Sequence, residues 1–272
     1  MSQPSTLASQ RTQSQPAPNP GDRCELSIII PAYNERERLP ETIGKILDYL
    51  KEHEWSWELL IADDGSSDGT PELIEADFPL VQVVRTPHNQ GKGGAVRRGM
   101  LAARGRLRLF SDADLSTPID ELDGMIPALE RGGYDLVIAS RALPESQLIV
   151  HQPWWREKAG RFFNRLVQPL SGLPYVDTQC GFKLFREGAA RLLFTRQQST
   201  GWAFDVEILM LAQLFGLSVL EYPVRWINDE ASKVSLLRAA PRMIRDILRF
   251  RWWRFTGRMS AEPGSLEGVR DH

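Results

Sequence analysis

Short apolar strands and amphipathic helices alternate along the first half of the chain, and this alternation limits the possible folds more than any other feature. An order of this kind with short connections predicts an α/β protein with a doubly wound, mostly parallel sheet. In such sheets ligands bind at the carboxyl ends of the strands, so we expect the chemistry in the loops that follow the strands. The expected strands are 26–30, 57–62, 81–84, 106–110 and 135–139, and the expected helices are 38–51, 91–103 and 118–131.

The composition is that of an ordinary globular protein, with 42% apolar and 25% charged residues in a chain of 272. A formal net charge of −2 gives no polybasic signal, so we expect no nucleic-acid partner. The two cysteines, Cys24 and Cys180, form no Cys-x-x-Cys or Cys/His cluster, which argues against a zinc site or a disulfide scaffold and fits a reducing compartment. Without a long apolar run, the chain is expected to be cytoplasmic and to carry neither a membrane span nor an export signal.

Changes in composition divide the chain into four parts. Residues 1–23 are rich in Ser, Gln, Pro and Thr and are predicted to be a disordered tail, because they hold too little apolar surface to offset their ordering entropy. Residues 24–234 are expected to form one globular domain. A basic amphipathic helix is predicted for 235–258 and a flexible tail for 259–272.

The expected strand that ends at Phe110 leads into Asp112-Ala113-Asp114. Alternate residues of an extended segment point the same way, so the two carboxylates can converge on one hard cation. Oxygen ligands suit Mg²⁺ or Mn²⁺ rather than zinc. The alternative is a turn in which the acidic side chains only cap a helix that begins at Pro118, and for an isolated Asp-x-Asp pair this alternative is favoured. The interpretation therefore depends on the neighbouring loops.

Two further strand-end loops carry polar groups. Asp63-Asp64-Gly65-Ser66 could bind the base edge and ribose of a nucleoside, or could be a capped turn before a helix. Asn89-Gln90-Gly91-Lys92-Gly93 is glycine-rich and opens a helix, which lets backbone N–H groups and Lys92 approach a phosphate. It lacks the Gly-Lys-Ser/Thr order of a Walker loop, and the first strand is followed by Pro31-Ala32-Tyr33-Asn34 instead of a dinucleotide fingerprint. Both the NTPase and the dehydrogenase interpretations are weakened.

Taken in order on one sheet, these loops resemble the sequential motifs of family 2 inverting glycosyltransferases of the GT-A fold, a Rossmann-like doubly wound architecture. Later motifs narrow the resemblance to the branch that makes polyprenyl-phosphate sugars, and in particular to dolichyl-phosphate β-glucosyltransferases. The resemblance covers roughly 25–234, and ordered motifs at this density are specific. The early motifs are Pro31-Ala32-Tyr33-Asn34-Glu35, Asp63-Asp64-Gly65-Ser66, Asn89-Gln90-Gly91-Lys92-Gly93 and Asp112-Ala113-Asp114. The later ones are Asp177-Thr178-Gln179-Cys180-Gly181-Phe182-Lys183-Leu184-Phe185, Trp202-Ala203-Phe204-Asp205-Val206-Glu207 and Ser232-Lys233.

The resemblance implies a nucleotide-sugar donor, UDP-glucose in the most similar relatives and GDP-mannose in a neighbouring branch, together with Mg²⁺ or Mn²⁺. Asp114 is implied as the main metal ligand with Asp112 beside it, while Lys233 would close over the donor diphosphate. The mannosyl branch has a metal-assisting Gln where this chain has Ser116, a shorter ligand. The donor-binding positions carried over from the family are Pro31, Ala32, Tyr33, Asn34, Glu35, Asp63, Asp64, Gly65, Ser66, Asn89, Gly91, Lys92, Gly93, Asp112, Ala113, Gln179 and Lys233.

The implied acceptor is a polyprenyl phosphate. A phosphate monoester has a second pKa near 6, so it is largely anionic at neutral pH and scarcely needs a general base. Catalysis would then consist mainly of positioning the phosphate oxygen while cations neutralise the leaving group. Asp205 and Glu207 are candidates for a base or for orienting residues, or they only favour the dipole of the helix that they open. The expected catalytic residues are Asp114, Asp205, Arg141 and Lys233, and the expected lipid-phosphate ligands are Arg141, Arg156 and Arg161.

The C-terminal segment is basic and amphipathic. One stripe carries arginines, the opposite face is apolar, and Trp252-Trp253 lies near the end. The pattern predicts peripheral docking on the anionic, cytoplasmic face of a membrane, or packing of the apolar face on the globular domain. The stripe comprises Arg238, Arg242, Arg245 and Arg249, and the apolar face Ile244, Ile247, Leu248 and Phe250.

Two other functions stay open on sequence alone. The same donor chemistry could act on a soluble phosphorylated acid, in which case lipid would be dispensable. A silent nucleotide-sugar sensor or membrane scaffold is the hypothesis from a different class, and the presence of both Asp112 and Asp114 argues against it.

Overall fold

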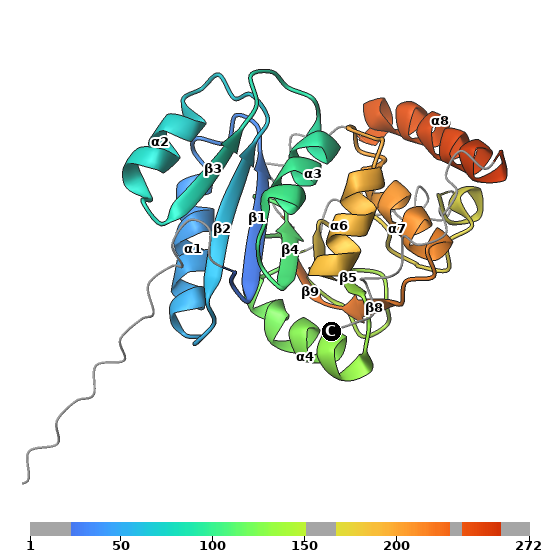
Figure 1. Ribbon diagram of the computed structural model, residues 1–272, viewed down its shortest axis with the longest axis horizontal. Coiled ribbons are helices and arrows are strands. Elements are labelled where there is room, and N and C mark those ends of the chain that lie inside the picture. Colours follow the sequence, from blue (N-terminus) through green and yellow to red (C-terminus); the bar gives the residue numbers. More distant parts are fainter. Residues whose placement is uncertain (1–22, 151–166, 229–235, 257–272) are drawn as a thin grey trace, which may run out of the picture.

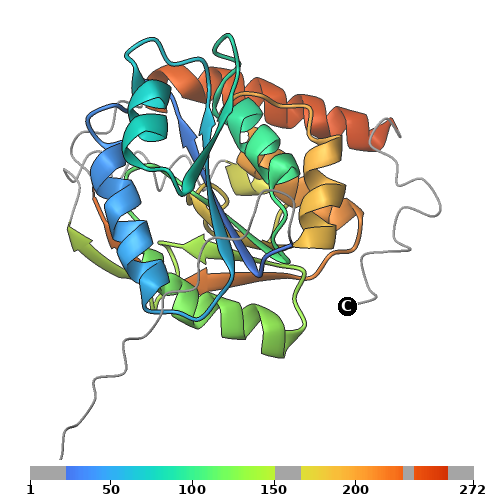
Figure 2. The same ribbon diagram turned by 60° about the vertical axis from the view of Figure 1, so that its left-hand side comes forward.

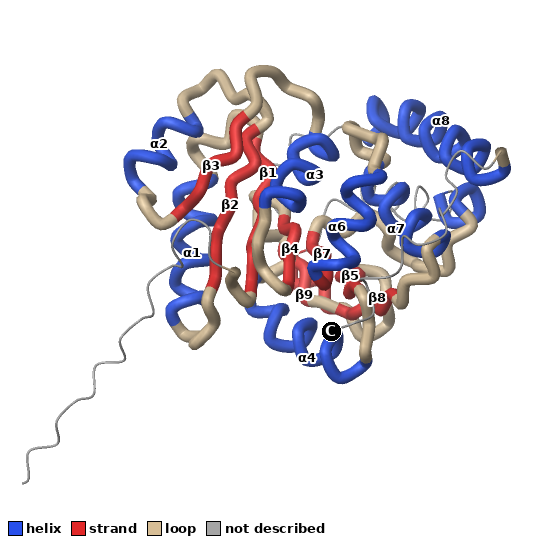
Figure 3. Tube along the Cα trace, viewed as in Figure 1, coloured by secondary structure: helices blue, strands red, loops and turns tan. Residues whose placement is uncertain are grey.

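The computed structural model describes residues 23–150, 167–228 and 236–256. A seven-stranded sheet forms the centre, in the order β3-β2-β1-β4-β7-β5-β8 (Figures 1 and 3). A two-stranded sheet joins β6 and β9. The strands are β1 Leu26–Ala32, β2 Trp57–Asp63, β3 Val81–Arg85, β4 Leu107–Ser111, β5 Leu136–Ser140, β6 Gln147–Val150, β7 Phe182–Arg186, β8 Val219–Pro223 and β9 Arg225–Ile227. The helices are α1 Leu39–Lys51, α2 Thr70–Asp77, α3 Lys92–Ala102, α4 Leu122–Gly132, α6 Glu187–Arg196, α7 Phe204–Leu214 and α8 Leu236–Phe255, and a 3₁₀ turn, η1, covers Ile119–Glu121.

The expected strands and helices of the first half are confirmed to within a few residues. β1 pairs in parallel with β2 on one side and with β4 on the other, as the alternating pattern predicts. The difference lies in the second half, where β7 enters between β4 and β5 and runs antiparallel to both. Because β7 begins beside the end of β4, with Phe182 opposite Ser111, it brings the preceding 177–181 loop to the carboxyl edge of the sheet.

Helices cover both faces of the central sheet (Figures 1 and 2). On β1, Ile29 faces a core shared with α3, α6 and α7, while Ile28 and Ile30 face a core shared with α1 and α4. These residues are completely buried, and their alternation follows the two-residue period of a strand. Burial on both faces explains why the central strands are continuous apolar runs.

Helix α8 packs on the globular domain through one side. Met243, Ile247 and Phe250 are at most 3% exposed and belong to the core that contains α7. Packing is therefore the correct interpretation of this apolar side. The sequence analysis also placed Leu248 there, but that residue is 48% exposed, together with Trp252 at 60% and Phe255 at 86%. A second apolar strip thus lies on the outer side of α8.

Phe250→Ala should lower the free energy of unfolding by about 3–5 kcal/mol, because it removes a buried aromatic side chain from the contact between α8 and the core. Leu248→Ala is the matched control on the same helix, and its effect should stay within about 0.5 kcal/mol because the side chain is already half exposed. Denaturant unfolding monitored by far-UV circular dichroism measures both. Equal effects from the two substitutions would contradict the observed packing, in which Phe250 faces the core and Leu248 faces outward.

Candidate active site

The three polar loops of the first half meet at one edge of the sheet. Parallel pairing brings together the ends of β1, β2 and β4, at Ala32, Asp63 and Ser111. A cleft of about 770 Å³ opens beside them, and its walls include Asn34, Thr42 and Asp114. The loops that follow β1, β2 and β4 thus lie at one edge of the sheet, as the alternating pattern predicts.

The Asp112-Ala113-Asp114 loop is held in place by its neighbours. Thr42 on α1 donates from Oγ1 to the carbonyl of Ala113 at 2.6 Å, and the N–H of Asp112 donates to the carbonyl of Gly181 at 2.9 Å. A Cβ at Gly181 would lie 2.0 Å from Oδ2 of Asp112, so only glycine fits beside this carboxylate. This contact gives a physical reason for a glycine in the motif that precedes β7.

The Asp-x-Asp carboxylates do not cap the following helix. Oδ1 of Asp114 accepts a hydrogen bond from the N–H of Ser116, within its own loop, and neither η1 nor α4 has a side-chain cap at its start. Burial, followed by the nearby Asp112 carboxylate, raises the pKa of Asp114 above its ordinary value. A divalent cation bound between the two carboxylates would offset their mutual repulsion.

The donor set fits Mg²⁺ or Mn²⁺ with help from a substrate. Within the described ranges, no group of three or more His, Cys, Asp and Glu side chains is arranged to hold a metal. Asp112 and Asp114 together offer only carboxylate oxygens. Mg²⁺ is usually bound in this way, through one or two carboxylates with the remaining positions taken by phosphate oxygens and waters. The geometry therefore suits a cation that arrives with a phosphorylated ligand.

A lysine pairs with one of these acids. Lys92, at the start of α3, forms an ion pair with Oδ1 of Asp112 at 2.6 Å and lies over the rings of Trp202 and Phe110. Burial opposes the charged form of Lys92, but the Asp112 and Asp205 carboxylates outweigh it and raise its pKa. A lysine that stays charged at this position is suited to contact a diphosphate.

Lys183 is the second cation, and the sequence analysis assigned it no role. It is the second residue of β7, is 1% exposed, and forms an ion pair with Oδ1 of Asp205 at 2.5 Å while donating to the carbonyl of Cys180 at 2.6 Å. Burial raises the pKa of Asp205 in spite of this pairing. A charged residue inside an otherwise apolar strand was the available signal, because a buried lysine requires a partner.

The nucleoside loop has one unsatisfied acceptor. Oδ2 of Asp63 accepts hydrogen bonds from the N–H groups of Gly65 and Ser66, at 3.1 and 3.2 Å. Oδ1 of Asp63 is buried and has no hydrogen-bond partner in the part of the chain that the structure describes. A buried acceptor without a partner is costly, so this atom is suited to accept a hydrogen bond from a ligand such as a nucleobase.

The first loop is tied to the nucleoside loop. The N–H of Asn34 donates to Ser66 Oγ at 2.9 Å, and Asn34 Oδ1 accepts from the N–H of Ser67 at 2.9 Å. Asn34 has φ of 55°, in the left-handed region that asparagine tolerates. The N-cap of α2 is Gly69, which offers no side chain to cap the helix, and Asp68 accepts a hydrogen bond from the N–H of Thr70, the first residue of α2.

Asp64 performs a different task from Asp63. Its Oδ2 accepts from the N–H of Gly91 at 2.7 Å, and its Oδ1 accepts from the N–H of Gln90 and from Nη2 of Arg98. Both oxygens are engaged by protein groups, and the side chain is 3% exposed. Asp64 therefore fixes the glycine-rich loop against the nucleoside loop.

The glycines of the Gly-Lys loop are required by a close backbone approach. A Cβ at Gly91 would lie 2.5 Å from the carbonyl oxygen of Thr200, and one at Gly93 would lie 2.8 Å from that of Ser199. The N–H of Gly94 donates to the same Thr200 carbonyl at 3.1 Å. The start of α3 thus packs directly on the 197–201 loop, a contact between distant parts of the chain that sequence spacing does not indicate.

Glu207 holds that loop from the other side. It is completely buried, and its two oxygens accept hydrogen bonds from the N–H groups of Gln198 and Ser199, both at 2.7 Å. Gln197 completes the network by donating from Nε2 to the carbonyls of Ser199 and Gly93. Of the roles considered for Glu207, these contacts favour an orienting residue over a base.

The acceptor-side predictions are only partly covered by the described residues. Arg141 binds the buried Asp177 through Nε and Nη2, at 2.6 and 2.8 Å, and this pairing holds the pKa of Asp177 below its ordinary value although burial opposes it. Gln179 donates from its backbone to Asp177 and from Nε2 to the sulfur of Met243 on α8. Three other predicted site residues, Arg156, Arg161 and Lys233, lie outside the described residues.

Known proteins resemble this chain in both sequence and structure. The chain matches the family described as glycosyl transferase family 2 over residues 27–194. It is 36% identical over 248 residues to a dolichyl-phosphate β-glucosyltransferase of Dictyostelium discoideum, an alignment that spans 86% of this chain and 76% of the relative. With the human dolichyl-phosphate β-glucosyltransferase the identity is 34% over 252 residues, spanning 86% and 76%.

Among solved structures, glucosyl-3-phosphoglycerate synthase from Mycobacterium tuberculosis in complex with UDP superposes with a TM-score of 0.61 at 20% identity, covering 89% of this chain and 82% of that one. Mannosyl-3-phosphoglycerate synthase from Rubrobacter xylanophilus gives a TM-score of 0.60 at 22% identity, covering 89% and 78%. At this identity the likeness concerns the fold alone, and it confirms the expected GT-A architecture. The family match and the relatives together show that the chain belongs to glycosyl transferase family 2.

Glu207→Gln should raise the KM for the nucleotide-sugar donor about tenfold and change kcat by less than about threefold. An amide nitrogen in place of one carboxylate oxygen would face a backbone N–H, which releases the 197–201 loop and with it the glycine-rich loop. Steady-state kinetics with varied donor measures the effect. Glu130→Gln, at an exposed position of α4, is the matched control, and a donor KM that is unchanged in both variants would contradict the proposed link.

The same variant should remove a pH effect on stability. Burial raises the pKa of Glu207 from an ordinary 4.5 to about 7. A carboxyl whose folded pKa lies above its unfolded value opposes folding once it ionises, so stability is lost as the pH rises through that range. The unfolding free energy of the wild type should therefore fall relative to that of Glu207→Gln between about pH 5 and about pH 8, as measured by denaturant unfolding at both values. A difference that does not vary with pH would exclude a raised pKa.

Proposed function

We propose that this protein transfers a hexose, with glucose favoured, from a nucleotide sugar to a polyprenyl phosphate with inversion at the anomeric carbon. The observation that carries the proposal is the cluster of Asp112, Asp114 and Lys92 at the sheet edge that also holds the unsatisfied Asp63 carboxylate. The two acids could hold a cation, Lys92 could contact a diphosphate, and Asp63 could accept a hydrogen bond from a nucleoside. These three functions together fit a nucleoside-diphosphate donor. The relatives named as dolichyl-phosphate β-glucosyltransferases support glucose and a lipid phosphate.

On the donor side, Asp63 Oδ1 would accept a hydrogen bond from the nucleobase, with UDP favoured over GDP. Asp114 and Asp112 would hold Mg²⁺ or Mn²⁺, which supplies positive charge to the leaving diphosphate. Lys92 already lies within ion-pair distance of Asp112 and would share that task. Lys233 is proposed, from the motif alone, to close over the same phosphates.

On the acceptor side, the nucleophile is a phosphate oxygen that is already ionised at neutral pH. No strong base is required, and the chain needs only to position that oxygen in line with the bond to the leaving group. Because Asp205 forms an ion pair with Lys183, we assign to this pair the role of balancing charge beneath the donor site. Arg141, anchored by Asp177, is the described candidate for contacting the acceptor phosphate, with Arg156 and Arg161 as further candidates.

The lipid acceptor requires access to a membrane surface, and α8 offers one. Its outer side combines the exposed apolar strip of Leu248, Trp252 and Phe255 with the neighbouring arginines Arg245 and Arg249. None of the helices within the described ranges has the length and apolar content needed to cross a bilayer. We propose that α8 lies peripherally on the anionic, cytoplasmic surface of the membrane through this outer side.

The purified protein should form glucosyl-phospholipid from UDP-glucose and a polyprenyl phosphate in the presence of Mn²⁺ or Mg²⁺. Asp114→Asn should lower the rate at least about 10³-fold, because it removes charge where the cation is held. Asp77→Asn, on exposed α2, is the control and should leave the rate unchanged. Product formation is followed with radiolabelled donor and organic extraction.

A panel of donors and acceptors separates the alternatives. GDP-mannose used in preference to UDP-glucose would correct the sugar but keep the reaction class. Turnover with a water-soluble phosphorylated acid and none with any polyprenyl phosphate would contradict the lipid acceptor. Absence of transfer from every donor, with donor binding intact, would favour a nucleotide-sugar sensor.

A further inference from the structure

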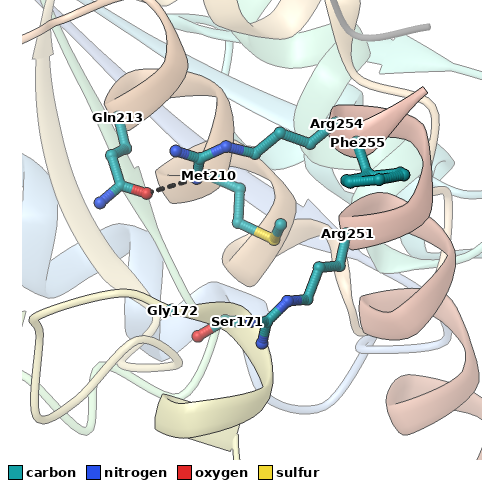
Figure 4. Close-up of a pocket in the computed structure, with 7 residues that line it drawn as sticks. All are labelled: Ser171, Gly172, Met210, Gln213, Arg251, Arg254 and Phe255. Carbon is teal, nitrogen blue, oxygen red and sulfur yellow. Dashed lines mark hydrogen bonds between the residues drawn. The ribbon is translucent and has the colours of Figure 1, made fainter. Parts of the chain in front are cut away.

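A second pocket, lined by two arginines, lies on the molecule away from the donor site. It has a volume of about 600 Å³ and lies between the C-terminal half of α8, the end of α7 and the helical residues 167–171 (Figure 4). The residues that line it are Ser171, Gly172, Met210, Gln213, Arg251, Arg254 and Phe255.

The position of the pocket separates it from the glycosyl-transfer chemistry. Met243 is the residue of α8 whose sulfur accepts a hydrogen bond from Gln179, a predicted donor-binding residue. Arg251 and Arg254 follow 8 and 11 positions later on the same helix, which at about 1.5 Å per residue places them roughly 12–17 Å further along its axis. Neither arginine belongs to the predicted catalytic or donor-binding residues.

The two arginines are held in fixed positions at the pocket. Nη1 of Arg251 donates to the carbonyls of Pro169 and Leu170, at 2.9 and 3.2 Å. Nη1 of Arg254 donates to Oε1 of Gln213 at 2.7 Å, the contact drawn in Figure 4. These contacts engage one terminal nitrogen of each guanidinium, and the fork also carries donors on Nε and Nη2. Each guanidinium therefore keeps donors that could bind the oxygens of a phosphate.

The positive charge of the pocket and the aromatic residues at its rim indicate which class of ligand it could bind. None of the described residues that line it is acidic, so two positive charges face the space without a carboxylate to neutralise them. Met210 and Phe255 contribute apolar walls, and Phe255 is 86% exposed. Trp252, at 60% exposed, lies one turn away on α8. A cationic pocket with an exposed aromatic rim is suited to a phosphodiester that carries acyl chains, because a free anion would gain nothing from the rim.

We propose that this pocket binds the headgroup phosphate of an anionic phospholipid while Phe255 and Trp252 enter the interface beside it. The site would fix the orientation of α8 on the membrane and hold the active site near its lipid acceptor. The inference rests on the membrane docking put forward under the proposed function, but it concerns binding rather than sugar transfer. It can therefore be tested without any turnover.

The test compares two charge-matched variants of the full-length protein. Arg251→Lys with Arg254→Lys keeps both charges but removes the planar forks, whereas Arg106→Lys with Arg131→Lys makes the same change at two exposed arginines outside α8. Co-sedimentation with vesicles of phosphatidylcholine containing 30% phosphatidylglycerol should show at least a fivefold weaker binding for the pocket variant and less than a twofold change for the control. Equal weakening of both variants, or of neither, would overturn the proposal.

A soluble probe separates the lipid from a simple anion. Dihexanoyl-phosphatidylglycerol below its micelle concentration should perturb the tryptophan fluorescence of the wild type and not that of the pocket variant. Inorganic phosphate at the same concentration should have no effect, and an equal effect of phosphate would overturn the assignment to a lipid. Thermal unfolding checks that the variants are folded, and the single variant Arg254→Lys, which leaves the Arg251 contacts to the helical residues 167–171 intact, repeats the test if the double variant is unstable.

Activity distinguishes the two proposals. Transfer to a short-chain, detergent-dispersed prenyl phosphate should be unchanged in the pocket variant, since the pocket is separate from the donor site. If the wild type transfers no sugar but still binds anionic vesicles through Arg251 and Arg254, the proposed function fails and the lipid site stands.

Discussion

The site depends on a balance of buried charges around the end of β4. Asp112 and Asp114 follow the end of β4, Lys92 at the start of α3 pairs with Asp112, and Lys183 on β7 pairs with the buried Asp205. Burying unpaired charge is costly, so each of these groups constrains the others. The pairing also explains the antiparallel β7. Because β7 starts beside the end of β4, it places Gly181 against Asp112 and Lys183 beneath the site.

The second half of the chain shapes the donor loops without forming most of them. Glu207 on α7 fixes the 197–201 loop, and the carbonyls of that loop form the surface on which Gly91 and Gly93 pack. Helix α8 lies against the same core. The proposed membrane contact at its outer side and the proposed donor contact at the glycine-rich loop would therefore belong to one packed unit.

Local patterns predicted much of this molecule. Alternating periodicity located the first five strands, and parallel pairing then required Asp63 and Asp114 to lie at one edge. Contacts between distant segments were not predictable. Nothing near Gly93 in sequence indicates the carbonyl of Ser199. Adjacent Asp63 and Asp64 look equivalent in sequence, although Asp63 keeps a buried oxygen without a partner among the described residues and Asp64 fixes a loop. In α8, periodicity showed two faces but not that Leu248 points outward, because that depends on where the core lies.

The central claim is that the strand-end carboxylates hold a divalent cation on the donor diphosphate. Electron paramagnetic resonance of Mn²⁺ titrated with the protein and UDP tests it without relying on turnover. The wild type should bind Mn²⁺ at least about tenfold more tightly with UDP present than without it, and Asp112→Asn with Asp114→Asn should remove that gain. A double variant that binds Mn²⁺ with UDP as tightly as the wild type would contradict the account.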